Sequence, residues 1–408
     1  MLTEVENDRL TQVVGDAPMA RLMREQCWVP FAKQTTMTFG QPPQRVRLFG
    51  EDFVAFRAED GRVGFVDERC PHRGVSLALA RVEGCALRCI YHGWKVDASG
   101  KVLEVPTEGS RSEEVAAKVK VNHYPTREAG GLIWVYLGRK APPEFPHLPF
   151  MDVPPENQFI TRTIAPCNWL QSLEGALDSS HVGWLHQSWF TKGGDVDATM
   201  VSVPPAFKTK DTRYGMRAAA IRDLPDGTSF LRVAEFIMPF TVLLATDRKS
   251  VGRELSSFMM VPIDSESHLL FWYIWNDSAP LGDMGYGSAG RDMENYAQLR
   301  GTRDTNWGQD RAAMESGHFS GFTEVLIQED VAAQVAMGPI ADRTREHLCS
   351  TDLAIAQARR NLLGYLKKFE AGDPVDAMRA YEQEGRLPFA GAVPKGFDWL
   401  SETIGAAA

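Results

Sequence analysis

Apolar and polar residues alternate in short runs from about residue 45 to residue 140. The runs RVRLFG, DFVAFRA and GRVGFVD are separated by Gly and Asp turns, and KVDASGKVLEV continues the pattern. Alternation with a period of two is typical of half-buried strands, and small turn residues between such runs favour hairpins. The pattern therefore predicts a compact antiparallel β domain over residues 45–140.

Six prolines crowd into residues 141–157, and the pattern changes after them. Proline fits neither a helix interior nor a central strand, so this stretch is a candidate linker. Beyond the linker, residues 168–187 have a helical pattern and residues 200–275 return to strand-like runs. From about residue 292 helices are expected to dominate, notably over residues 321–338 and 350–372.

These patterns place the chain in the α+β class and divide it into three parts. Residues 1–40 are expected to form a helical segment that packs on the larger, C-terminal domain. A β domain follows at residues 41–145, and residues 146–408 form the larger domain. With 408 residues, of which 44% are hydrophobic, the chain is long enough for two sizeable cores.

Charge and cysteine usage exclude several classes of protein. The formal net charge is −9 and no basic block occurs, so nucleic acid is not an expected partner. The longest strongly apolar run, Leu269–Trp275, is too short to cross a bilayer and indicates a buried strand. The N-terminal residues show no targeting signal, and the six cysteines lack the spacing of a disulfide framework. We therefore expect a protein of the reducing cytoplasm that does not associate with a membrane.

Cys70-x-His72 and Cys89-x-x-His92 form two short arms separated by sixteen residues. Two thiolates and two imidazoles can hold either a tetrahedral zinc ion or a two-iron, two-sulfide cluster. Zinc fingers usually pair Cys with Cys and His with His, whereas each arm here carries one of each, which suits a cluster whose two irons are both reached by each loop. Cys85 lies between the arms and fits neither, so it is expected to be a small packing residue.

A second group of candidate ligands, Asp178, His181 and His186, lies on the helix expected over residues 168–187. Asp178 and His181 are three apart and share a helix face. His181 and His186 are five apart, which on a regular helix turns them about 140° away from each other. They can bind one ion only if the helix is broken or bulged near Gly183. Spacing alone leaves open that they are two unrelated histidines.

Two segments resemble a known family. CPHRG with CIYHGW resembles the Rieske signature, and NWLQSLEGALDSSHVGWLH resembles the iron-binding segment of Rieske non-heme iron oxygenases, particularly the phthalate dioxygenase-like group. The resemblance covers nearly the whole chain, from PMARLMREQCWVP to MGPIADRTREHLCSTDLAIAQARR. It implies an N-terminal antiparallel β Rieske [2Fe–2S] domain. It also implies a catalytic domain with a curved antiparallel sheet covered by helices, a helix-grip-like fold with substrate between sheet and iron.

The resemblance also implies which side chains bind the metals. His181 and His186 join a carboxylate from a later helix in a 2-His-1-carboxylate Fe(II) site. In the matching run QEDV the carboxylate is Asp330, with Glu329 as its neighbouring competitor, and because adjacent residues on a helix point about 100° apart, one of the two is expected to face the iron. The implied ligands of the [2Fe–2S] cluster are Cys70, His72, Cys89 and His92.

Asp178 receives a different role by the same resemblance. It is implied to bridge His92 of one chain to His181 of the next, because the two centres within one chain are expected to lie too far apart for fast electron transfer. A carboxylate that accepts from both imidazoles would orient the rings and couple the metals. The expected assembly is a homo-oligomer of this subunit alone, a trimer or a hexamer.

The resulting hypothesis is the terminal oxygenase of a multicomponent system, which uses O2 to dihydroxylate or hydroxylate an aromatic, carboxylated substrate. Gly285-x-Gly287-x-x-Gly290 is not at a βα turn, so no dinucleotide site is expected and a separate NAD(P)H-dependent reductase, with flavin and [2Fe–2S] centres, must supply the electrons. One alternative is a monooxygenase that demethylates or cleaves aryl ethers. Another, from a different class, is an electron-transfer Rieske protein without oxygenase chemistry.

Overall fold

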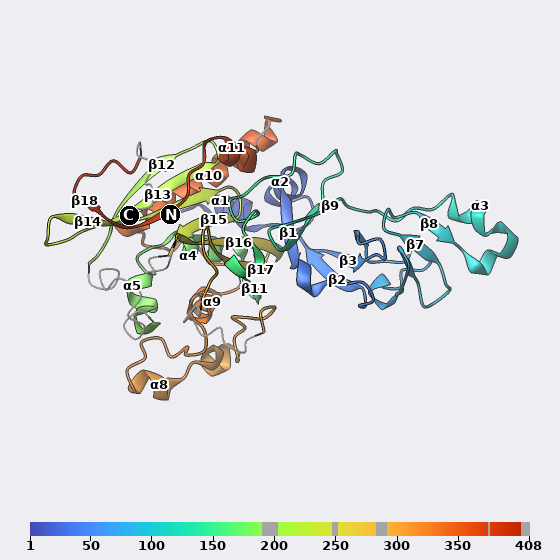
Figure 1. Ribbon diagram of the computed structural model, residues 1–408, viewed down its shortest axis with the longest axis horizontal. Coiled ribbons are helices and arrows are strands. Elements are labelled where there is room, and N and C mark those ends of the chain that lie inside the picture. Colours follow the sequence, from blue (N-terminus) through green and yellow to red (C-terminus); the bar gives the residue numbers. More distant parts are fainter. Residues whose placement is uncertain (190–202, 247–251, 283–291, 374–375, 401–408) are drawn as a thin grey trace. The chain divides into compact units, whose positions relative to one another are not determined.

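The chain divides into two compact units in a computed structural model, which describes residues 1–189, 203–246, 252–282, 292–373 and 376–400 (Figure 1). The larger unit comprises Met1–Val13, Ala17–Met19 and Pro146–Ala408, and the smaller unit comprises Val14–Asp16 and Ala20–Phe145. The glycine-rich motif at residues 285–290 and parts of the expected strand region, residues 200–202 and 247–251, lie outside the described residues.

The smaller unit is built from three small antiparallel sheets, as the alternating pattern predicts. The first sheet has the order β1-β10-β9, the second β2-β3-β4 and the third β5-β6-β7-β8. Their bounds are β1 Trp28–Lys33, β2 Gln44–Leu48, β3 Glu51–Arg57, β4 Val63–Asp67, β5 Arg81–Glu83, β6 Ala86–Arg88, β7 Lys95–Asp97, β8 Val102–Glu104, β9 Thr126–Ala129 and β10 Leu132–Tyr136. The alternation did not predict the short helix α3 (Ser112–Ala116), which follows the 3-10 turn Pro106–Arg111.

The N-terminal 40 residues are divided between the two units. Helix α1 (Glu4–Thr11) belongs to the larger unit and begins with a capping box between Thr3 and Glu6. Helix α2 (Pro18–Gln26) lies largely in the smaller unit. The residues after it form the strand β1 instead of more helix, because the apolar run WVPFAK is buried and pairs with β10. Residues 1–40 therefore do not form one segment on one domain.

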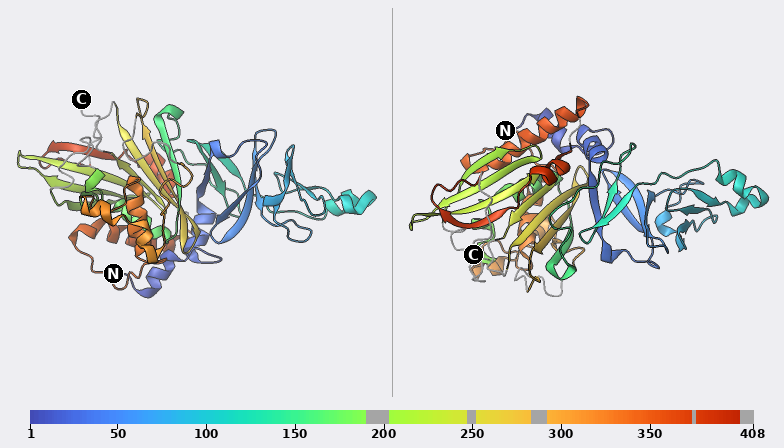
Figure 2. Two further views of the ribbon diagram at one scale, coloured as in Figure 1. Left: turned by 90° about the horizontal axis from the view of Figure 1, so that it is seen from below. Right: turned by 45° about the horizontal axis from the view of Figure 1, so that its top comes forward.

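The larger unit contains an eight-stranded antiparallel sheet (Figure 2). The strand order is β11-β17-β16-β15-β14-β13-β12, with β18 paired to β14. The apolar run predicted as a buried strand is the centre of β17, which is buried at nine consecutive positions. The bounds are β11 Gln158–Ala165, β12 Ala206–Asp211, β13 Gly215–Asp223, β14 Thr228–Ile237, β15 Thr241–Ala245, β16 Glu254–Asp264, β17 Ser267–Asn276 and β18 Phe389–Pro394.

Helices pack against this sheet and complete the predicted α+β domain. Helix α4 (Trp169–Leu177) packs against β16, and α10 (Leu353–Glu370) packs against β12 and β13, while α9 (Leu326–Ala336) packs against α4. No helix among the described residues is long and apolar enough to cross a membrane. The remaining α-helices of the described part are α5 Val182–Leu185, α8 Arg311–Glu315 and α11 Ala377–Glu384.

A buried ionic cluster joins α4 to α10 and to the loop before α10. Glu174 of α4 accepts hydrogen bonds from Arg343, at 2.9 and 3.0 Å, and from Arg359 of α10, at 2.7 Å. Arg359 also pairs with Glu346. Burial alone would raise the pKa of Glu174, but the two guanidinium groups outweigh it and hold that pKa below its usual range. The cluster therefore fixes α4, the helix that leads into the candidate iron site.

Replacing Glu174 by Ala should lower the free energy of unfolding of the larger unit by about 3–5 kcal/mol, because two buried guanidinium groups would lose their shared counter-charge. Urea unfolding followed by tryptophan fluorescence measures the change. Glu370→Ala is the matched control, since its ion pair with Arg9 is about one-third exposed and should contribute at most about 1 kcal/mol. Equal effects of the two substitutions would contradict this role.

Candidate metal centres

The two arms of the first motif adopt the same turn. The Cys70 amide donates to the Val75 carbonyl at 2.8 Å, and the Cys89 amide donates to the Trp94 carbonyl at 2.9 Å. In each arm a glycine four residues after the cysteine donates back to the cysteine carbonyl. These glycines have φ angles of 76° and 72°, a left-handed conformation that side chains disfavour. The two arms that carry the candidate ligands are therefore loops of matching backbone conformation.

The four candidate ligands of the cluster gather at these loops. The rings of His72 and His92 have centroids 4.4 Å apart, and His72 stacks on Trp94 at 5.1 Å with an interplanar angle of 2°. Cys70 and Cys89 are both 3% exposed. Burial raises the pKa of the Cys70 thiol to about 11, and the adjacent Cys89 thiol adds to the rise. Two neighbouring buried thiolates need a cation to compensate them, so the donor set fits a metal centre.

The fifth candidate of this motif lies away from the loops. Cys85 is half-buried at the edge of the smaller unit's core and contacts the carboxylate of Asp60. The histidine side of the motif reaches the surface, since His72 is exposed and the neighbouring Ile90 and Tyr91 are 58% and 54% exposed. A centre held here would therefore have buried sulfur ligands and accessible imidazole ligands.

The helix expected over residues 168–187 is interrupted in the structure. Helix α4 ends at Leu177, Asp178 adopts an extended conformation, and the Asp178 side chain accepts from the Ser180 amide at 2.7 Å. This local bond competes with the helical pattern and turns the chain. The break precedes His181 instead of lying near Gly183, so the prediction of one continuous helix was wrong.

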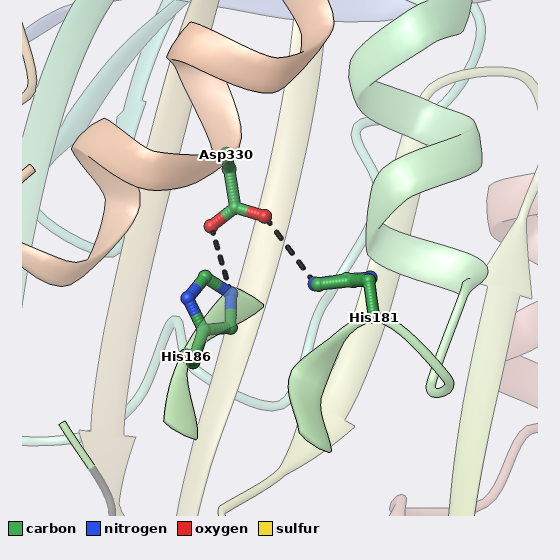
Figure 3. A group of neighbouring side chains, drawn as sticks. All are labelled: His181, His186 and Asp330. Carbon is green, nitrogen blue, oxygen red and sulfur yellow. Dashed lines mark ion pairs between the residues drawn. The ribbon is translucent and has the colours of Figure 1, made fainter. Parts of the chain in front are cut away.

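The break brings the second group of ligands together. His181 and His186 flank the single-turn helix α5, and both face Asp330 of α9 (Figure 3). Oδ1 of Asp330 lies 3.3 Å from Nε2 of His181, and Oδ2 lies 3.3 Å from Nε2 of His186. One ligand atom from each of the three residues lies within 4.8 Å of the others. Glu329 points elsewhere, to Nδ1 of His186 at 2.6 Å. Asp330 is therefore the carboxylate on the side shared by both imidazoles.

The electrostatics of this group suit a cation. Burial alone would raise the pKa of Asp330, but the two histidines outweigh it and lower that pKa. Burial alone would lower the pKa of His181, yet Asp178 and Asp330 raise it to about 9. The pKa of His186 is raised against burial as well, first by Asp330. The group thus favours bound positive charge, and a divalent ion with two imidazoles and one carboxylate can replace those protons.

Asp178 lies on the far side of His181 from Asp330. Its Oδ2 is 3.7 Å from Nδ1 of His181, and its side chain is 23% exposed. Burial alone would raise the pKa of Asp178, but His181 outweighs it and lowers that pKa. Asp178 therefore contacts a candidate iron ligand while part of its carboxylate stays accessible.

A cavity of about 100 Å³ adjoins His181, His186 and Asp330. It lies between α4, α9 and the strands β14–β17, and Phe258 and Trp272 stack in its wall, with ring centroids 6.1 Å apart and an interplanar angle of 7°. Among the described residues that line it, Arg232 of β14 is the one arginine or lysine. The sequence interpretation missed Arg232, although a cation inside the apolar run SFLRVAEF was a usable signal.

Comparisons with known proteins agree with this division of the chain. Family models match residues 27–125, described as "Rieske [2Fe-2S] domain", and residues 135–406, described as "LigXa C-terminal domain like". The chain is 38% identical to the phthalate 4,5-dioxygenase oxygenase subunit of Pseudomonas putida, over 98% of this chain and 94% of that protein. It is 35% identical to the 3-chlorobenzoate-3,4-dioxygenase oxygenase subunit of Comamonas testosteroni, over 94% of this chain and 90% of that protein.

A solved structure supports the fold alone. NdmA of Pseudomonas putida CBB5 with caffeine has a TM-score of 0.62 at 20% identity, covering 92% of this chain and 98% of that one.

Replacing Asp330 by Ala should abolish iron binding in the larger unit, because two imidazoles would remain without the carboxylate they share. Iron analysis should show the loss, whereas the visible spectrum of the cluster in the smaller unit should persist. Asp226→Ala, at an exposed turn, is the control and should retain both metals. Full iron content in the Asp330 variant would point to another carboxylate, Glu329 first.

Proposed function

The chain belongs to the Rieske non-heme iron oxygenases with a LigXa-like C-terminal domain, and we propose that its substrate is a carboxylated aromatic compound. It is the oxygenase subunit of a multicomponent system, an oxidoreductase whose electrons come from a separate reductase. It uses a Rieske [2Fe–2S] cluster and a mononuclear iron. The observation that carries the substrate proposal is Arg232, the one arginine or lysine among the described residues beside the candidate iron site.

The side chains of this chain divide the work. When bound, the cluster supplies single electrons and the mononuclear Fe(II) supplies the chemistry that activates O2. His181, His186 and Asp330 would hold the Fe(II), because two imidazoles and one carboxylate are a donor set that suits this ion. The surrounding apolar wall excludes water from the reacting ring. The side chains that hold the cluster are Cys70, His72, Cys89 and His92.

Asp178 is the bridge between the two centres in this proposal. Its contact with Nδ1 of His181 and its partial exposure support the role, because one carboxylate can accept from His181 and from a second imidazole. The second imidazole is His92 of a neighbouring copy, in a homo-oligomer that is a trimer or a hexamer. The partner that delivers electrons is an NAD(P)H-dependent reductase with flavin and [2Fe–2S] centres.

In this proposal, Arg232 and the aromatic wall recognise different parts of the substrate. Trp272 and Phe258 offer flat apolar faces against which an aromatic ring can stack. The Arg232 guanidinium can pair with the carboxylate of the substrate and so fix which edge of the ring faces the iron. The two relatives are named for phthalate and 3-chlorobenzoate, which are both carboxylated aromatic rings.

A panel of aromatic acids and aryl ethers, assayed with O2, NADH and a surrogate reductase, tests the reaction. Aromatic acids should give diols or hydroxylated products, and release of formaldehyde from methyl ethers would instead favour the demethylase alternative. Without the reductase, NADH should give no product.

Replacing Arg232 by Gln should raise KM for the preferred acid by roughly 30-fold or more, since a charge pair in a desolvated site is worth about 2–5 kcal/mol. Steady-state kinetics measure the change. The uncharged amide of the same acid should be affected little by the substitution. Equal losses for acid and amide would show that Arg232 does not recognise the carboxylate.

The route through Asp178 predicts complementation between subunits. Cys70→Ala should lose the cluster and Asp330→Ala should lose the iron, so each variant alone should be inactive. Oligomers reassembled from both should recover part of the activity, because a cluster on one chain can serve the iron on its neighbour.

Asp178→Asn is the third variant of this test. It should keep both metals yet lose nearly all turnover. It should not restore activity to Asp330→Ala, because no chain in that mixture has both Asp178 and iron, whereas its intact cluster should restore part of the activity of Cys70→Ala. Recovery of activity in the mixture of Asp178→Asn with Asp330→Ala, or normal turnover of Asp178→Asn alone, would remove Asp178 from the route.

A further inference from the structure

Glu329 is a fully buried carboxylate directly beside the candidate iron ligands. Its exposed fraction is 0%, and it precedes Asp330 on α9. One of its oxygens lies 2.6 Å from Nδ1 of His186, and the other accepts from the hydroxyl of Ser320. A buried carboxylate is unfavourable unless its oxygens are paired, and here both oxygens have a partner.

We propose that Glu329 is a positioning residue that prepares His186 for iron. The proposal rests on the iron site formed by His181, His186 and Asp330. A Glu329 carboxylate can only accept, so Nδ1 of His186 must carry the proton. This tautomer leaves the lone pair of Nε2 directed to the side of Asp330, where the metal binds. The negative charge behind the ring also makes the imidazole a stronger donor to the metal.

A closed set of hydrogen bonds holds Glu329 and His186 in register. Ser320 donates to Glu329, and its oxygen also accepts from the Phe322 amide at 3.1 Å. A further hydrogen bond links the same loop to the segment just after His186. In this bond the Phe319 amide donates to the Ser188 hydroxyl at 2.8 Å. The loop before α9 is thus fixed both to Glu329 and to the residues just after His186, which restrains the ring from two directions.

The two iron histidines consequently differ. His186 is 4% exposed and has a short contact to a carboxylate with 0% exposure. His181 is 23% exposed, and its distal carboxylate, Asp178, lies 3.7 Å away and is itself 23% exposed. We infer that Glu329 serves iron retention, whereas Asp178 serves the electron route, although both carboxylates stand behind an iron-binding imidazole.

Fe(II) affinity of Glu329→Gln, measured by competition with a chromogenic chelator, tests the proposal without turnover. The amide keeps the size of the side chain but removes its charge, so the dissociation constant should rise roughly 10–100-fold, the usual cost of losing such a partner. Substitution with Co(II) gives a second readout, since its visible bands should shift when His186 becomes a weaker donor. The cluster spectrum reports in the same sample that the smaller unit is folded.

Glu235→Gln is the matched control. Glu235 is equally buried and is paired with Tyr214 and Arg217, but it lies on β14 at odd spacing from Arg232 and so on the opposite face of the strand. It should retain wild-type Fe(II) affinity and Co(II) bands. Equal iron loss in both variants would mean general damage to the domain and would overturn the proposal.

The remaining outcomes separate this inference from the iron site itself. If Asp330→Ala loses iron while Glu329→Gln binds Fe(II) as tightly as the wild type with unchanged Co(II) bands, Glu329 is not a positioning residue although the site stands. If Asp330→Ala keeps its iron, the site assignment fails and the Glu329 proposal fails with it. If Fe(II) binds more weakly to Glu329→Gln but not to Glu235→Gln, and Asp330→Ala loses its iron, the results support both the iron site and the positioning role of Glu329.

Discussion

The meeting of α9 with the broken end of α4 is the constraint on which the larger unit depends. It places one largely buried carboxylate, Asp330, against the buried imidazole of His186 and the partly buried imidazole of His181, and the three ionisable groups compensate one another's charge there. Residues of the sheet and of both helices line the adjoining cavity. The ionic cluster centred on Glu174 then anchors α4 to α10, so the helix that leads to the ligands is fixed by charges as well as by apolar packing.

The smaller unit positions its candidate ligands by repeating one backbone turn. One turn is used twice, with a cysteine at its start and a glycine in the left-handed conformation four residues later. Repetition gives the two loops the same backbone turn, each with one cysteine and one histidine, which suits a centre of two metal atoms. The cysteines are buried while the histidines approach the surface, so the side accessible to electron exchange is the imidazole side.

Three carboxylates lie around the candidate iron site, and their surroundings distinguish the roles proposed for them. Asp330 faces both imidazoles, as a ligand must. Glu329 is enclosed and paired on both oxygens, which suits a fixed acceptor behind His186. Asp178 is partly exposed and stands behind His181 at a longer distance, which leaves it available to a second imidazole. Burial and direction alone thus distinguish neighbouring residues of the same chemical type.

The sequence by itself determined the α+β class, the β domain with its two ligand arms, and the candidate residues around His181, because these depend on local periodicity and on residue types at short spacing. It did not predict that α4 breaks at Asp178, since a helical apolar pattern continues through that residue and only the bond to the Ser180 amide interrupts it. Nor could spacing separate Asp330 from Glu329, or single out Arg232. Which side of α9 meets α4, and which face of β14 lines the cavity, is set by packing between segments distant in sequence, so only the tertiary structure decided it.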